Sequence, residues 1–243
     1  MKLFAGTSGF SYKEWRGRFY PADLPDRQML AHYATALPTV EINNTFYRMP
    51  KREVLEGWAG QVPQSFTFAL KAPQRITHRE RLEGSDDSLG FFFGATSGMG
   101  DKLGPVLFQL PPFLRKDVPR LEAFLGKLPA GLRAAFEFRH ATWFDDDTYA
   151  ALRAHGAALV GGDAEDAEKS PPLVATAGFG YLRLRAEEYT EASLTAWADR
   201  LRAQPWTSVF VYLKHEVRGP EFAETLSRLF GEPTKPADSP GSA

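Results

Sequence analysis

Short runs of β-branched and aromatic residues alternate with longer helix-like segments along almost the whole chain. Several runs are nearly continuously apolar, such as VLFQL, AALVGG and VFVYL, which is typical of strands buried on both faces of a parallel sheet. Eight such strands are predicted, at Leu3–Gly6, Thr39–Asn43, Phe66–Lys71, Pro105–Leu110, Arg133–Phe138, Ala157–Asp163, Gly180–Leu184 and Ser208–Leu213.

Helical patterns fill most of the connections between these strands. The exception is the segment from Ala164 to Phe179, which contains Pro171-Pro172 and shows no helical period after Lys169. This arrangement predicts an α/β fold, a (β/α)8 barrel of the TIM type with an irregular connection between strands 6 and 7. The alternative, an open doubly wound sheet, usually has fewer strands and a glycine-rich phosphate turn after the first one. The helices are predicted at Asp26–Ala36, Arg52–Gly60, Asp87–Leu103, Asp117–Leu128, Asp145–His155, Thr190–Ala203 and Pro220–Phe230.

Composition limits the chemistry that this barrel can perform. The 243 residues include no cysteine, so disulfides, thiolate nucleophiles and cysteine-bound metal sites are excluded. The formal charge of −1 argues against a protein whose main task is non-specific adhesion to nucleic acid or to membranes. The short apolar run near the N-terminus and the lack of any stretch of ~20 apolar residues predict a soluble cytoplasmic protein.

No internal linker is long enough to separate two domains. We therefore predict a single domain over residues 1–230. The last residues, 231–243, read GEPTKPADSPGSA and carry no large apolar side chain, which predicts a disordered tail.

Polar side chains collect at the predicted C-terminal strand ends, where barrels of this type build their active sites. Alternation places Glu41 and Asn43 on one face of their strand, and likewise Glu137 and Arg139. The candidate catalytic residues are Glu137, Glu41 and Asp163. The candidate ligand-binding residues are Thr7, Ser8, Tyr12, Trp15, Asn43, Lys71, His78, Gln109, Arg139, His140, Trp143, Arg183 and Lys214.

Several of these residues have a purely structural alternative. Glu41 and Lys71 lie on adjacent strands and are equally suited to a buried charge pair that closes the core. Trp15 and Trp143 are of a type more often used for packing than for stacking on a ligand. A metal site from Glu41, Glu137, Asp163 and His140 is a further alternative, but no residue spacing specifies it, so we predict no metal and assign no cofactor.

The sign of charge at the strand ends indicates the ligand class. The cations gathered there predict a basic region within a neutral protein, which suits an anionic small molecule, and arginine in particular suits carboxylate or phosphate. Aromatic side chains interleaved with these cations leave single-stranded nucleic acid as a second partner class. The cations are Lys71, Arg81, Arg139, Arg183, Arg185 and Lys214.

Six long motifs resemble the DUF72 family, also called YecE-like proteins. They read GTSGFSYKEWRGRFYP, VEINNTFYRMP, FTFALKAPQRITHRERL, LFQLPPFL, AFEFRHATWF and GYLRLR, and they cover nearly the whole chain except its tail. The resemblance implies a TIM-type barrel and implies no catalytic residues.

The chain departs from the family pattern after the seventh and eighth strands. The family commonly has His-Gly where this chain has Arg185-Ala186, and an aromatic followed by Asn and Asp where it has Tyr212 to Glu216. An activity that depends on those family residues would require His215 and Glu216 to replace them.

Two functions remain open at this stage. The first is an enzyme with hydrolase-type acid–base chemistry on an anionic or phosphorylated ligand, in which Glu137 transfers the proton and Lys71 and Arg139 hold the anion. The second is a non-catalytic protein that binds nucleic acid or a metabolite. The sequence does not predict an oligomeric state.

Overall fold

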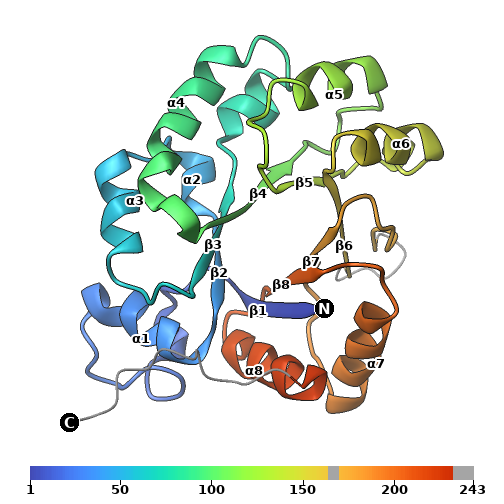
Figure 1. Ribbon diagram of the computed structural model, residues 1–243. Helices are drawn as coiled ribbons and strands as arrows, with labels where there is room; N and C mark the ends of the chain where they lie inside the picture. The colour runs from blue at the N-terminus through green and yellow to red at the C-terminus, as the bar shows by residue number, and fades with distance from the viewer. Residues whose placement is uncertain (164–169, 232–243) are drawn as a thin grey trace.

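Parallel strands pair in chain order, and the first pairs with the last, so the sheet closes into a barrel (Figure 1). The computed structural model describes residues 1–163 and 170–231. The predicted (β/α)8 architecture is confirmed. The strands are β1 Lys2–Ser8, β2 Thr39–Ile42, β3 Thr67–Lys71, β4 Leu103–Gln109, β5 Ala134–Glu137, β6 Ala158–Gly162, β7 Phe179–Leu184 and β8 Ser208–Leu213.

Helices surround the barrel on the outside, as Figure 1 shows. The one-turn helix α2 directly after β2 was not expected from the sequence. The long helix expected over 87–103 is shorter, because a 3-10 segment with a left-handed Gly100 (φ 53°) follows it and leads into β4. The helices are α1 Met29–Ala36, α2 Asn44–Tyr47, α3 Arg52–Ala59, α4 Asp86–Thr96, α5 Val118–Leu125, α6 Asp146–Ala154, α7 Glu191–Arg202 and α8 Gly219–Phe230.

The connection between β6 and β7 is irregular, as predicted. Residues 170–178, the described part of it, contain no helix. Within the described ranges, no helix has the length and the apolar character needed to cross a membrane. The predicted disordered tail, from residue 232 onward, lies outside the described residues.

The interior of the barrel is apolar and aromatic in its lower layers. Phe4 and Phe210 stack at a centroid distance of 4.6 Å, and Tyr181 and Tyr212 lie above them. Because side chains alternate in direction along a strand, the residue two positions beyond each inward-facing core residue also points inward. The inward-facing side chains are therefore mostly apolar in the lower layers and become polar at the C-terminal strand ends.

Gly162 ends β6 at the level of those polar side chains and pairs with Arg183 of β7. Its φ of +140° is a backbone conformation that residues other than glycine rarely adopt. A Cβ at this position would lie 2.1 Å from the carbonyl oxygen of Arg183. Glycine at this position therefore lets β6 approach the backbone that carries Arg183.

We expect Gly162→Ala to destabilise the fold by about 1–3 kcal/mol from backbone conformation alone, with the clash adding to this. Gly90→Ala is the matched control, because Gly90 is exposed in α4 with open space around its Cα, and it should stabilise by about 0.5–1 kcal/mol. Urea denaturation measures both values. Equal effects of the two substitutions would contradict the role given to Gly162.

Candidate functional site

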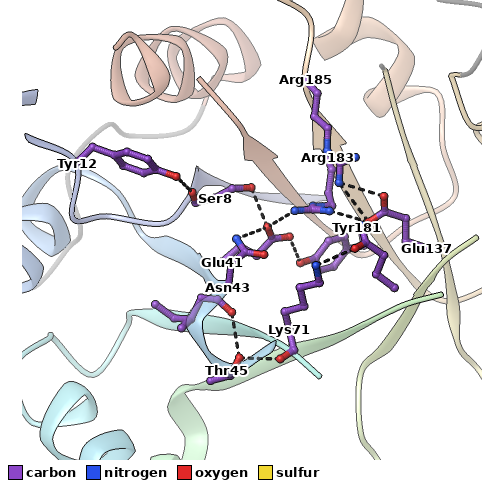
Figure 2. A network of polar contacts seen from close by, with 12 residues as sticks. Ser8, Tyr12, Glu41, Asn43, Thr45, Lys71, Glu137, Tyr181, Arg183 and Arg185 are labelled. Carbon is purple, nitrogen blue, oxygen red and sulfur yellow. Dashed lines mark hydrogen bonds and ion pairs between the residues drawn. The ribbon is translucent and has the colours of Figure 1, made fainter. Parts of the chain in front are cut away.

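Six strands contribute one side chain each to a connected polar layer at the C-terminal end of the barrel (Figure 2). Hydrogen bonds and ion pairs join every member to at least one other, and Arg185 extends the layer upward from β7. The polar layer consists of Ser8 of β1, Glu41 of β2, Lys71 of β3, Gln109 of β4, Glu137 of β5 and Arg183 of β7.

Arg183 bridges two carboxylates at the centre of this layer. Its Nη2 lies 2.9 Å from Glu41 Oε1 and its Nη1 lies 2.7 Å from Glu137 Oε2. All three side chains are less than a tenth exposed. Because these side chains are shielded from water, an unpaired charge here would cost folding free energy, so the two ion pairs stabilise one another. They also connect β7 to both β2 and β5.

Glu41 accepts hydrogen bonds from three further neighbours. Ser8 Oγ donates to its Oε1 at 2.7 Å and Asn43 Nδ2 at 3.1 Å, while the Tyr181 hydroxyl donates to Oε2 at 2.6 Å. The Tyr181 pKa is raised well above its ordinary value, first by burial and then by the charge of Glu41, so this hydroxyl keeps its proton.

Glu137 is held in the same way on the opposite side of the barrel. Gln109 Nε2 donates to its Oε2 at 2.9 Å, and Arg185 Nη2 donates to its Oε1 at 3.0 Å. Arg185 is about a fifth exposed, and its Nε has no hydrogen-bond partner among the described residues. It therefore lies at the boundary between the polar layer and solvent.

Lys71 is the one primary amine of the polar layer. Its Nζ donates to Gln109 Oε1 at 2.7 Å and lies 3.9 Å from the centroid of the Phe46 ring. Burial, followed by the charge of Arg183, lowers the pKa of Lys71 to about 8. Lys71 is therefore the cation of the layer that can lose its proton near neutral pH.

The short helix α2 positions Phe46 against this amine. Thr45 Oγ1 donates to the carbonyl of Lys71 at 2.6 Å and contacts the carbonyl of Ile42 at 3.2 Å, so α2 is tied to the ends of both β2 and β3. The Phe46 ring also meets the edge of His78 at 4.9 Å. Burial, then the charges of Lys71 and Arg139, lowers the pKa of His78.

Asp163, predicted as catalytic, lies beside the polar layer and orders the loop after β7. Its Oδ1 accepts the backbone N–H groups of Arg185 and Ala186, and the hydroxyl of Tyr189 contacts both of its oxygens, at 2.9 and 2.8 Å. Burial raises the pKa of Asp163. Its contacts fix the backbone from which Arg185 projects.

The structure places both candidate tryptophans in the core, away from the polar layer. Trp15 is 1% exposed and packs against Tyr12, Tyr20 and other rings. Trp143 is fully buried, stacks on Phe138 at 4.5 Å and donates its indole N–H to a backbone carbonyl. The packing alternative thus describes their positions, because the loops that carry them fold back against the barrel.

Other candidates make local contacts outside the polar layer. The Thr7 hydroxyl donates to the Gly9 carbonyl at 2.6 Å and faces Tyr33, and the Tyr12 hydroxyl donates to the Ser8 carbonyl at 2.6 Å. His140 contacts Thr142 at the start of a 3-10 turn. Arg139 and Lys214 are exposed beyond the ends of β5 and β8.

The expected Glu41–Lys71 pair is replaced by a bond to β7. Glu41 pairs with Arg183 rather than with Lys71, because the arginine reaches across the barrel to both carboxylates. Glu137 pairs with Arg183 and Arg185, and Arg139 lies beyond the end of β5 with its side chain in solvent.

Tyr181 and Phe46 were absent from the sequence-based candidates, and Arg185 was expected only as one of the cations at the strand ends. Alternation along Tyr181-Leu182-Arg183-Leu184-Arg185 was the available signal for Tyr181, since every second residue faces inward. No signal pointed to Phe46, whose place depends on the unexpected helix α2.

The histidine that follows β8 has a structural role in this chain. His215 Nδ1 accepts the backbone N–H of Arg218 at 2.9 Å, directly before α8, and its ring meets the edge of Phe222 at 5.3 Å. These contacts position the start of α8. Over residues 1–163 and 170–231, no group of three or more His, Asp or Glu side chains is arranged to hold a metal ion.

A closed (β/α)8 barrel with a buried charge network at its C-terminal end defines the structural class, a TIM-type barrel protein. The sequence matches the family described as "Protein of unknown function DUF72" over residues 4–242, so the chain belongs to the DUF72 family. The family resemblance of its motifs is confirmed.

Relatives and solved structures agree with this assignment. The UPF0759 protein YecE of Escherichia coli K12 is 34% identical over 116 residues, which cover 47% of this chain and 43% of that protein. The UPF0759 protein YunF of Bacillus subtilis is 29% identical over 159 residues, covering 60% of this chain and 54% of that protein. The matches thus span about half the length of these relatives.

A DUF72 family protein from Thermotoga maritima has the same fold, with a TM-score of 0.84, 24% identity, and coverage of 96% of this chain and 100% of that one. A DUF72 family protein from Enterococcus faecalis gives a TM-score of 0.79 at 17% identity, covering 98% and 100%. Both similarities bear on the fold.

We expect Arg183→Met to cost about 3–5 kcal/mol of folding stability, because it leaves two buried carboxylates without their shared cation. Arg185→Met is the matched control, because Arg185 directly follows the same strand. It should cost less, because Arg185 pairs with Glu137 alone and is partly exposed. Urea denaturation compares the two, and a loss under about 1 kcal/mol for Arg183→Met would contradict the bridging role.

Proposed function

We propose that this protein is an enzyme that binds a small anionic ligand at the C-terminal end of its barrel and performs acid–base chemistry on it. The observation that carries the proposal is the composition of the polar layer with Arg185: three cations lie against two carboxylates, and one of the cations is an amine with a pKa of about 8. A surplus of positive charge beside solvent attracts an anion, and a group that titrates near neutrality can transfer a proton.

Two arginines are placed to receive the anion. Arg185 is partly exposed and is fixed from behind by Glu137. Arg139 is exposed beyond β5, and its charge acts on both Lys71 and His78. Guanidinium groups bind carboxylate and phosphate through paired hydrogen bonds.

Lys71 suits proton transfer better than the carboxylates that the sequence suggested. Glu41, Glu137 and Asp163 each accept hydrogen bonds from at least three neighbouring groups, which supports an anchoring role for all three. Lys71 Nζ donates to a single acceptor, Gln109 Oε1, and its nearby apolar group is the Phe46 ring. Hydrolysis with Glu137 as the acid or base stays a prediction.

A second candidate, binding of single-stranded nucleic acid, is favoured by an aromatic pocket on the outside of the barrel. Tyr47 and Phe91 are each 73% exposed and line a pocket of about 300 Å³ together with Phe46, Arg75 and Arg79. Exposed rings beside arginines suit stacked bases and their phosphates. Retention on single-stranded DNA that falls steeply with salt and is lost in the double variant Tyr47→Ala, Phe91→Ala would favour this candidate.

Anion binding is tested by thermal shift and calorimetry with inorganic phosphate and malonate at low ionic strength. We expect saturable binding to the wild-type protein that weakens at least tenfold in Arg139→Ala and in Arg185→Ala, because each removes one guanidinium from the proposed site. Arg202→Ala is the matched control, since Arg202 pairs with Asp199 on α7. Its binding should equal that of the wild type.

The proposal is contradicted if neither anion binds, or if binding is unchanged in both Arg139→Ala and Arg185→Ala. Loss of binding in Arg202→Ala to the same extent would indicate a general charge effect and would contradict a localised site.

A further inference from the structure

Among the described residues, burial also lowers the pKa of Lys102, but the environment of this second lysine differs from that of Lys71. Lys102 lies at the opposite end of the barrel, directly before β4, where its Nζ donates to the carbonyls of Ala59 and Val62 at 2.7 and 2.8 Å. Those bonds use the amine to hold a loop. Lys71 Nζ instead has side chains as its neighbours and binds no backbone carbonyl in the described residues. These neighbours are an amide oxygen, a ring face and nearby cations.

We propose that Lys71 is a nucleophile that forms an imine with an anionic aldehyde or ketone. This inference rests on the proposed function and deepens it, because it names the substrate class as a carbonyl compound that carries a carboxylate or phosphate. A lysine becomes nucleophilic when burial and a nearby cation favour its neutral form, and both conditions hold here.

The reaction needs no oxidant or reductant. The lone pair of the neutral Lys71 Nζ attacks the carbonyl carbon, a C–N bond forms, and the carbonyl π electrons move to oxygen. Two protons leave the nitrogen and the oxygen departs as water, so that the amine and the carbonyl compound give an imine and one water molecule. The imine can then accept the electron pair of a neighbouring C–H or C–C bond as that bond breaks.

Gln109 connects the amine to the group that would hold the anion. It accepts from Lys71 Nζ at 2.7 Å and donates to Glu137 Oε2 at 2.9 Å, and Glu137 in turn holds Arg185. The chain of contacts fixes the amine and the Arg185 guanidinium relative to each other. A carbonyl group next to a carboxylate matches these two groups, because its electrophilic carbon can meet the amine while its anionic end meets the guanidinium.

Phe46 supplies the apolar side of the site. Its ring lies 3.9 Å from Lys71 Nζ and is itself only partly buried, so it lies between the amine and the outside. An aromatic face stabilises the ammonium form moderately but offers it no hydrogen-bond acceptor. This leaves the nitrogen lone pair free for bond formation once the proton is lost.

The test is reductive trapping with sodium cyanoborohydride at pH 7.5. Glyoxylate is the anionic aldehyde, and acetaldehyde is its neutral counterpart. Peptide mass spectrometry then locates the carboxymethyl or ethyl group left on nitrogen. We expect glyoxylate to modify Lys71 at least about tenfold faster than Lys102, and to saturate with concentration, because a neutral amine and an anion site act together there.

Lys71→Arg retains a positive charge and removes the primary amine, so its trapping at this position must vanish while modification elsewhere continues. Arg185→Ala should lower the preference for glyoxylate over acetaldehyde at Lys71. The inference is overturned if Lys71 is modified no faster than Lys102, or if the two aldehydes label it equally at the same concentration.

The two proposals fail separately. Saturable phosphate or malonate binding without trapping at Lys71 would remove the imine and leave the anion-binding enzyme standing. Absence of both would remove the proposed function as well.

Discussion

The ion pairs of Arg183 with Glu41 and Glu137 determine how the upper part of this barrel is built. A guanidinium buried between two carboxylates must be paired on both sides, because each unpaired charge would cost several kcal/mol in so dry a place. The bridge fixes the relative positions of β2, β5 and β7. It also explains why β6 presents Gly162 at this level: β6 places no side chain between Arg183 and Glu137.

The same bridge sets the chemistry open to the neighbouring residues. Because the two glutamates are engaged by arginine and by hydroxyl or amide donors, they act as structural anchors. Arg183 cannot lose its proton, and its charge lowers the proton affinity of the amine beside it. Lys71 thus becomes the titrating group of the layer. The proposed anion binding and the proposed imine formation both rest on this contrast between hydrogen-bonded anchors and one titrating amine.

The sequence predicted the architecture well, and it placed the polar side chains at the correct end of the barrel, but it did not predict the partners of Glu41. Alternation and parallel strands place Glu41, Lys71, Gln109 and Glu137 at one end, because a period of two and a common strand direction are properties of the local sequence. The partners of Glu41 depend on how far Arg183 reaches across the closed barrel, which is a tertiary property. Strand alternation could not predict the position of Trp15, because this residue lies in a loop that has no strand periodicity. Its position depends on packing against Tyr20 and Tyr33.

The most direct test of the central claim is an NMR titration of the Lys71 side chain, observed at its Cε carbon and assigned by comparison with Lys71→Arg. Burial and the charge of Arg183 predict a midpoint near pH 8, with the amine protonated below it and neutral above it. A midpoint near the ordinary lysine pKa of about 10.4 would contradict the account, because the amine would then be a permanent cation at neutral pH.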